Sequence, residues 1–200
     1  MVRHPYQRRG KSLKEFLRYK KVKVKRVLRF YDGDTIRVQF LDGYQVNVRF
    51  LLVDTPELNH PEKGRQPFAR AARAFTKQII TNSKEIRLSR DREVWDHHGR
   101  LLAYVYCDGK LIQEYLVECG YARVYHTRNK NRKVIRRLYR LQEMAKKKRK
   151  KIWKYEHYVG FDGFHPEAVG RGKAIGMVRQ LMRINKLFES LHSQSICPKS

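Results

Sequence analysis

Two short segments of the chain hold the side chains best suited to chemistry. The first is Asp32-Gly33-Asp34-Thr35, and the second runs from Arg49 to Glu57 through Asp54. Carboxylates without His or Cys neighbours favour a hard cation such as Ca²⁺ or Mg²⁺, and arginine presents a planar fork to two phosphate oxygens. Glu57 could accept a proton from an attacking water. Together these residue types suit the hydrolysis of a phosphodiester.

Each segment alone also has an ordinary structural interpretation. Asp-Gly pairs usually make turns, and Asp-Thr-Pro-Glu often starts a helix. A predicted hairpin that joins the segments favours the functional interpretation. With a two-residue turn at Asp42-Gly43, Asp34 lies opposite Leu51 and shares a sheet face with Arg49. Asp54 then lies about 10 Å beyond Leu51, and a bend at Thr55-Pro56 would bring it closer.

The elements that must position these residues are short strands followed by helices. The first strand begins at Val22, and the alternating pattern continues at Thr35–Phe40, Gln45–Val53, Glu85–Leu88 and Leu101–Cys107. Apolar residues at helical spacing predict three helices: one after Pro67, one over Leu111–Cys119 capped by Gly120, and one marked by Val134, Leu138, Leu141 and Ala145. This order predicts an α+β fold, a small β-barrel with helices packed on it.

Three motifs in order resemble the staphylococcal nuclease (thermonuclease) family. They are Tyr31–Thr35, Arg49–Glu57 and Asp96–Tyr104, and the Asp108-Gly109-Lys110 turn fits as well. The resemblance covers about residues 22–153. It implies a five-stranded OB-fold barrel with three helices, a Ca²⁺ requirement, and endonucleolytic cleavage of DNA and RNA that leaves 3′-phosphates.

The family's functional residues can be assigned where the motifs match. The resemblance implies that Asp34 and Asp54 are calcium ligands, and that Thr55 offers its backbone carbonyl. It also implies that Arg49 and Arg100 hold the scissile phosphate. Glu57 then becomes the general base. Arg100 is assigned by the resemblance alone.

The chain departs from the family's pattern around the nucleotide pocket. A Lys-Tyr pair commonly precedes the Gly-Arg of the family, whereas this chain has His97-His98. The pocket's aromatic positions fall near His126 and Arg128, and Tyr125 could serve if the register shifts by one. We expect His97, His98 and Tyr125 to contribute to substrate binding. The departures affect phosphate affinity and base preference more than the type of reaction.

The charge of the chain points to a polyanionic partner. Lys and Arg number 46 against 19 Asp and Glu, which gives a formal net charge of +27. Nucleic acid is the commonest partner of such a chain. Residues 128–151 hold 13 Lys or Arg and a single acid, Glu143. Two alternatives stay open: a non-catalytic OB-fold module that binds nucleic acid, and a basic protein that docks on anionic membranes.

The remaining features concern organisation and compartment. We expect a basic leader at residues 1–21, a nuclease-like domain at 22–153 and a basic extension of unknown role at 154–200. Cys107, Cys119 and Cys197 form no CxxC pair and do not resemble a disulfide scaffold or a zinc site. No apolar run approaches a membrane span, and we see no signal peptide. We therefore expect a cytoplasmic monomer, with organelle targeting or another secretion route still open.

Overall fold

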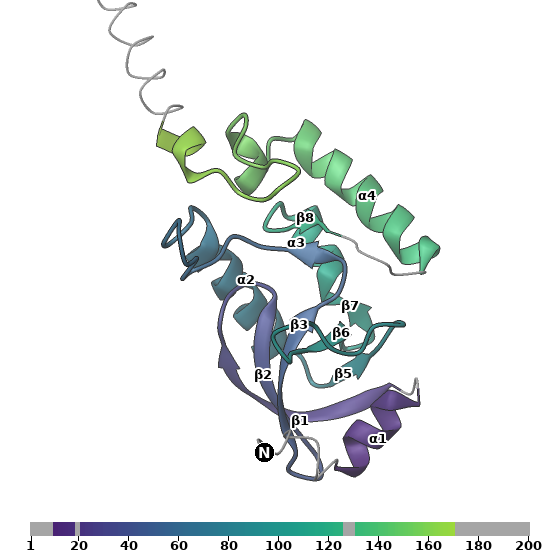
Figure 1. Cartoon of the computed structure of the whole chain (residues 1–200). Helices are drawn as coiled ribbons and strands as arrows, with labels where there is room; N and C mark the ends of the chain where they lie inside the picture. Colours follow the sequence, from purple (N-terminus) through teal and green to yellow (C-terminus); the bar gives the residue numbers. More distant parts are fainter. Residues whose placement is uncertain (1–9, 19–20, 126–130, 171–200) are drawn as a thin grey trace, which may run out of the picture. The chain divides into compact units, whose positions relative to one another are not determined.

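A closed five-stranded barrel forms the core of the first structural unit (Figure 1). The computed structural model describes residues 10–18, 21–125 and 131–170. The barrel strands are β1 (Val22–Phe30), β2 (Thr35–Phe40), β3 (Gln45–Phe50), β5 (Ile86–Ser89) and β6 (Leu101–Cys107). They pair in the order β3-β2-β1-β5-β6, and a parallel pairing of β3 with β6 closes the ring. The predicted α+β barrel is confirmed, and this mixed closed sheet is consistent with an OB-fold.

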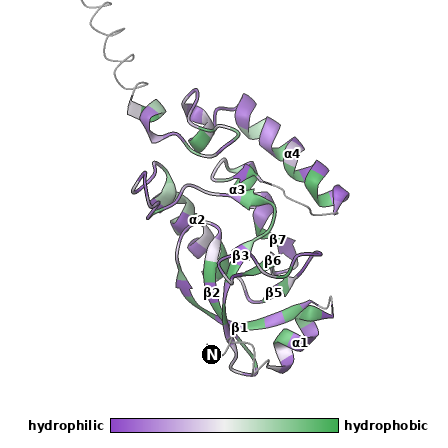
Figure 2. Ribbon diagram, viewed as in Figure 1, coloured by the Kyte–Doolittle hydropathy of each residue, from purple (hydrophilic) through white to green (hydrophobic). Residues whose placement is uncertain are grey.

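The barrel encloses an apolar core because inward-facing residues alternate along its strands. On β2, Ile36, Val38 and Phe40 are fully buried, whereas Arg37 between them is exposed. Figure 2 shows the same alternation as mixed hydrophobic and hydrophilic colour along the strands. The short strand β7 (Lys110–Leu111) extends the sheet beyond β6.

The hairpin between β2 and β3 differs from its predicted form by one residue. The backbone N–H of Phe40 donates to the carbonyl of Tyr44 at 2.9 Å, which leaves a three-residue loop at 41–43. Gly43 takes a positive φ of +82° there, as the last position of such a loop requires. The predicted two-residue turn is therefore wrong, and Asp34 lies opposite Phe50 rather than Leu51.

Four helices accompany the barrel in the described part of the first structural unit, residues 1–154. They are α1 (Lys11–Leu17), α2 (Ala69–Thr81), α3 (Ile112–Glu118) and α4 (Arg132–Lys147), and a short 3₁₀ turn follows at Lys151–Lys154. The last three match the predicted helices. The helix α1 lies within the predicted basic leader, where no helix was predicted, and it buries Leu13 and Phe16 in the hydrophobic core.

A two-stranded sheet outside the barrel was not predicted from the sequence. It pairs β4 (Val53–Asp54) with β8 (Arg123–Val124), so Asp54 lies directly opposite Arg123. Strands of two residues carry no detectable alternation, which explains why the pattern did not show them.

The chain divides into a second unit at Tyr155, of which residues 155–170 are described. In this unit Val159 pairs with Phe164, and the ring of Tyr158 packs on that of Phe164. Over the described residues, no helix is both long and apolar enough to cross a membrane.

Candidate active site

Arg49 connects the two acidic segments. Its Nη1 lies 2.6 Å from Oδ2 of Asp34, and its Nη2 lies 2.9 Å from Oδ1 of Asp54. Nη1 also donates to the carbonyl of Val53 at 3.0 Å. Both carboxylates therefore converge on one guanidinium, at the end of the barrel where β2 begins and β3 ends.

The convergence depends on a sharp turn at Leu51-Leu52. β3 stops at Phe50, and Leu52 adopts a left-handed backbone conformation with φ of 67° before β4 begins. This turn brings Asp54 back onto Arg49. The bend that we expected at Thr55-Pro56 thus comes earlier in the chain, before the aspartate rather than after it.

Asp34 is the most buried acid of the site, with 3% of its surface exposed. Its Oδ2 accepts the backbone N–H of Thr55 at 2.7 Å, and its Oδ1 accepts the hydroxyl of Thr35 at 3.1 Å. Burial raises the pKa of Asp34 to about 7, against the lowering effect of Arg49 and with a further raising effect of Asp32. The fold thus holds this carboxyl at considerable electrostatic cost, which is common at functional sites.

Four acids act together on the charge of Arg49. Burial by itself lowers the pKa of Arg49, but Asp34, Asp54, Asp32 and Glu57 raise it above its usual value. These four carboxylates outnumber Arg49 and Arg123, the two arginines that pair with them, which leaves a net negative local field. Such a field favours a bound cation.

Arg123 was missed by the sequence analysis and completes the cluster. Its Nε lies 2.8 Å from Oδ2 of Asp54, so that carboxylate is held between two arginines. Arg123 is 8% exposed, and its guanidinium lies 5.4 Å from the centre of the Tyr125 ring. A lone arginine in a chain with so many basic residues offers no signal before the β4–β8 pairing is known.

Arg100 approaches the cluster from the other side of Thr35. Asp96 fixes it through its Nε at 2.6 Å and its backbone N–H at 2.8 Å. Burial opposes ionisation of Asp96, but the hydrogen bonds from Arg100 lower its pKa overall. Nη1 of Arg100 reaches the hydroxyl of Thr35 at 3.4 Å, and that hydroxyl donates to Asp34. The hydroxyl of Thr35 therefore links the side chain of Arg100 to that of Asp34.

Glu57 is exposed and lies on a loop that its backbone holds in place. Its N–H donates to Oε1 of Gln66 at 2.7 Å, and its carbonyl accepts the N–H of Gln66 at 2.9 Å. Gln66 is buried, so this clamp fixes the loop against the domain while the Glu57 side chain stays open to solvent. Glu57 and Asp32 line a polar pocket of about 280 Å³.

Comparison with known proteins decides the family. The family model described as "Staphylococcal nuclease homologue" matches residues 47–155. A thermonuclease of Staphylococcus hyicus is 41% identical over 128 residues, which cover 64% of this chain and 74% of that protein. The chain belongs to the staphylococcal nuclease family.

Two Bacillus subtilis relatives in this range are longer proteins. The SPbeta prophage-derived endonuclease YokF is 40% identical over 138 residues, which make up 68% of this chain and 46% of YokF. Endonuclease YncB is 41% identical over 138 residues, with 68% of this chain and 64% of YncB covered. The chain thus spans less than two thirds of each of these two relatives.

Three described positions near which the chain departs from the nuclease family's pattern, His97, His98 and Tyr125, are exposed. His97 and His98 are exposed on the turn before Arg100, with ring centres 3.8 Å apart. Tyr125 is 49% exposed, next to Arg123. All three are accessible to a ligand. His126 and Arg128 lie outside the described residues.

The donor atoms of the cluster suit a hard cation. Asp34 and Asp54 supply carboxylate oxygens, which Ca²⁺ and Mg²⁺ prefer. The hydroxyl of Thr55 is buried without a hydrogen-bond partner among the described residues, so a polar group beside the carboxylates stays unsatisfied. Within the described ranges, no cluster of three or more His, Cys, Asp or Glu is arranged to hold a metal. A cation would therefore complete its shell with backbone carbonyl and water oxygens.

Proposed function

We propose that this chain is a Ca²⁺-dependent endonuclease that hydrolyses DNA and RNA with little sugar specificity and leaves 3′-phosphates. The observation that carries the proposal is the position of Arg49 between Asp34 and Asp54, within reach of the fields of Asp32 and Glu57. A pure binding surface for a polyanion has no use for four carboxylates at its centre.

The roles follow from the chemistry of the side chains. Asp34 and Asp54 are the proposed calcium ligands, together with the backbone carbonyl of Thr55. Bound Ca²⁺ supplies positive charge for the extra negative charge that develops on the phosphate during attack. Arg49 and Arg100 bind the phosphate oxygens through their planar guanidinium groups.

Glu57 is the proposed general base. It takes a proton from the attacking water, and its exposed side chain permits contact with a solvent molecule and a substrate. The Gln66 clamp fixes the backbone of Glu57, and the Glu57 carboxylate forms no ion pair with the described residues, so it is available to accept a proton.

Cleavage of single-stranded DNA, titrated with Ca²⁺ and with Mg²⁺, tests the proposal. Glu57→Gln and Arg100→Ala should each lower the cleavage rate by at least roughly 10²-fold, because each removes stabilisation of the transition state. Arg37→Ala is the matched control, since Arg37 is exposed on β2 and removes one arginine from the barrel surface. Tight, salt-dependent binding with no Ca²⁺-stimulated cleavage would assign the chain to non-catalytic binding instead.

A further inference from the structure

The helix α4 carries more Lys and Arg residues than any other helix or strand in the described part of the chain. It contains seven Lys or Arg and one acid, Glu143. Its inner face is held by Leu138, Gln142 and Ala145, which are buried. Figure 2 shows hydrophilic colour over much of the rest of the helix.

Four of the basic residues form one continuous stripe on the outer face. Lys133, Arg136, Arg140 and Lys147 follow each other at intervals of 3, 4 and 7 residues, which places them on the same side of a helix. All four are exposed. At a rise of 1.5 Å per residue, the stripe is about 21 Å long. We call these four residues the α4 basic stripe.

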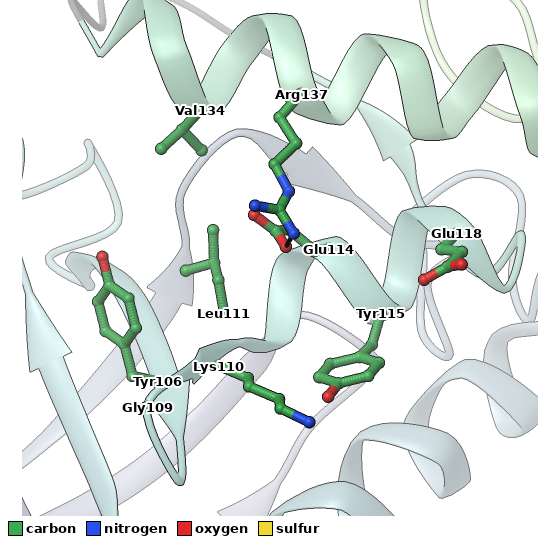
Figure 3. Close-up of a pocket in the computed structure, with 9 residues that line it drawn as sticks. All are labelled: Tyr106, Gly109, Lys110, Leu111, Glu114, Tyr115, Glu118, Val134 and Arg137. Carbon is green, nitrogen blue, oxygen red and sulfur yellow. Dashed lines mark ion pairs between the residues drawn. The ribbon is translucent and has the colours of Figure 1, made fainter.

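Two of the other basic residues of α4 pair with acids of the protein. Arg137 forms an ion pair with Glu114 of α3 at 2.9 Å, and Lys146 pairs with Glu143 at 2.8 Å. Figure 3 shows Arg137 turned toward Glu114 at the edge of a pocket between α3 and α4. Within the described residues, no member of the α4 basic stripe makes an ion pair, so its positive charge faces outward unneutralised.

The helix that carries the stripe is fixed to the edge of the active site. Oε1 of Gln142 accepts the backbone N–H of Val124 in β8 at 2.7 Å. The neighbouring residue of β8, Arg123, binds Asp54. One rigid connection therefore runs from the acidic cluster through β8 to α4.

We propose that the α4 basic stripe is an accessory binding surface for the phosphate backbone of a polynucleotide whose scissile bond lies in the active site. This inference rests on the proposed function. Regularly spaced cations without partners release counterions from a phosphate chain and so strengthen binding without reading sequence. A long strand gains this contact, and a substrate of two or three nucleotides is too short to reach it.

An anionic membrane fits the same helix less well. A helix that lies in a membrane interface needs an apolar face free to enter the lipid. The apolar face of α4 packs inside the protein through Leu138 and Ala145, and Val134 and Leu141 also pack against the core. The exposed side carries the basic residues and only two large apolar ones, Tyr139 and Met144, at 38% and 49% exposure, which is less than an apolar face that enters lipid and suits a phosphate backbone better.

The test compares Arg136→Gln/Arg140→Gln with Arg26→Gln/Arg37→Gln. The control pair removes the same two charges from exposed positions on β1 and β2. Binding of a labelled single-stranded 30-mer is measured in chelator over a range of salt concentrations. Cleavage of a dinucleotide is measured separately with Ca²⁺. The binding measurement tests the α4 basic stripe even if the chain has no nuclease activity. A negative result for the stripe can therefore be told apart from a negative result for the proposed nuclease function.

We expect the stripe variant to bind the 30-mer at least about tenfold more weakly at 0.1 M salt. The slope of log affinity against log salt should become shallower by about 1.4, which corresponds to two lost phosphate contacts on a single strand. Dinucleotide cleavage should stay unchanged. Equal 30-mer affinity in the two double variants overturns the proposal. Loss of binding to anionic vesicles in the stripe variant, with 30-mer binding intact, also overturns it and assigns the stripe to membranes.

Discussion

Arg49 compensates for a concentration of negative charge that would otherwise destabilise the end of the barrel. Asp34 is nearly fully buried. An unpaired buried carboxylate costs on the order of several kcal/mol, which is a large part of the free energy of unfolding of an ordinary domain. The guanidinium offsets this cost for Asp34 and Asp54 at once. Among the described residues, Asp32 and Glu57 form no ion pair, so the site keeps a net negative charge that a bound cation would neutralise.

This demand predicts how metal binding varies with pH. Burial raises the pKa of Asp34 to about 7, from about 3.9 in an unfolded chain. Without metal, protonated Asp34 stabilises the fold below pH 4, and that contribution is lost as the pH rises through 7. Ca²⁺ requires the ionised form, so its affinity should fall by up to about tenfold for each pH unit below 7. Calorimetric titration with Ca²⁺ at pH 6, 7 and 8 measures the affinity at each pH. The same affinity at all three pH values would contradict the prediction.

The ion pair of Arg123 with Asp54 leads to a prediction about stability. Arg123→Leu leaves Oδ2 of Asp54 without its partner at 2.8 Å in a largely buried position. We expect a loss of about 2–4 kcal/mol in the free energy of unfolding in chelator. Saturating Ca²⁺ should reduce this loss, because the cation takes over the neutralisation of Asp54. Denaturant unfolding with and without Ca²⁺ measures both values.

The control for this substitution is Arg87→Leu. Arg87 pairs with Glu85 on the surface, and such a pair contributes little to stability. Its effect should be small and equal with and without Ca²⁺. An Arg123→Leu loss that is the same in both conditions would separate Arg123 from the metal site.

Individual residues were predictable to the extent that they lie in motifs. Asp34, Arg49 and Asp54 come together as the hairpin suggested, although the register that suggested it was off by one. They still meet because Asp34 precedes β2 and so escapes the strict alternation of faces, while its backbone carbonyl accepts the N–H of Phe50. Arg123 could not be predicted, because its role depends on a pairing of two-residue strands.

At the scale of elements, local signals located the strands well and the turns less well. β2 and β6 have the predicted bounds, since β2 alternates apolar and polar residues and β6 is an uninterrupted apolar and aromatic run. The predicted strand to Val53 is broken at Leu52, whose positive φ is unfavourable for a leucine and leaves no mark in the sequence. The strained turn at Leu52 directs Asp54 back toward Arg49. The site therefore depends on a backbone conformation that the sequence does not indicate.

The contact between the Asp32–Thr35 turn and α2 yields the next prediction. A Cβ on Gly33 would lie 2.8 Å from Cβ of Ala72 and 2.9 Å from the side chain of Thr55. Thr76 of α2 also donates its hydroxyl to the carbonyl of Gly33. Gly33→Ala should force α2 away from the turn, destabilise the fold by about 1–3 kcal/mol and lower cleavage as Asp34 shifts.

Gly170→Ala provides the comparison for this element-scale test. A Cβ at Gly170 meets nothing within 4 Å, and its backbone needs no positive φ. Thermal unfolding and cleavage of single-stranded DNA are measured for both variants. A Gly33→Ala protein as stable and active as the Gly170→Ala protein would show that the turn tolerates a side chain.

At the scale of the whole molecule, the net positive charge and the acidic site are expected to have different effects on a polyanionic ligand. The net charge of +27 attracts a phosphate backbone over distances up to the Debye length, about 8 Å at physiological salt. The carboxylates near Arg49 oppose this attraction locally unless a cation is present. Binding is thus expected to depend steeply on monovalent salt, and cleavage on the divalent ion.

The division at Lys154 gives the last prediction. Ile152 is fully buried, and its N–H donates to the carbonyl of Gly120 at 3.1 Å, so the 3₁₀ turn is part of the barrel unit. A chain that ends at Lys154 should fold and show the proposed Ca²⁺-dependent cleavage of a dinucleotide at a rate within about twofold of the full chain, since the site's ion pairs all lie before that residue. A chain that ends at Lys150 loses Ile152 and should be less stable by about 3 kcal/mol or more. Thermal unfolding of the two truncated chains beside the full chain makes the measurement; equal destabilisation of both would mean that residues 155–200 belong to the same folding unit as the barrel.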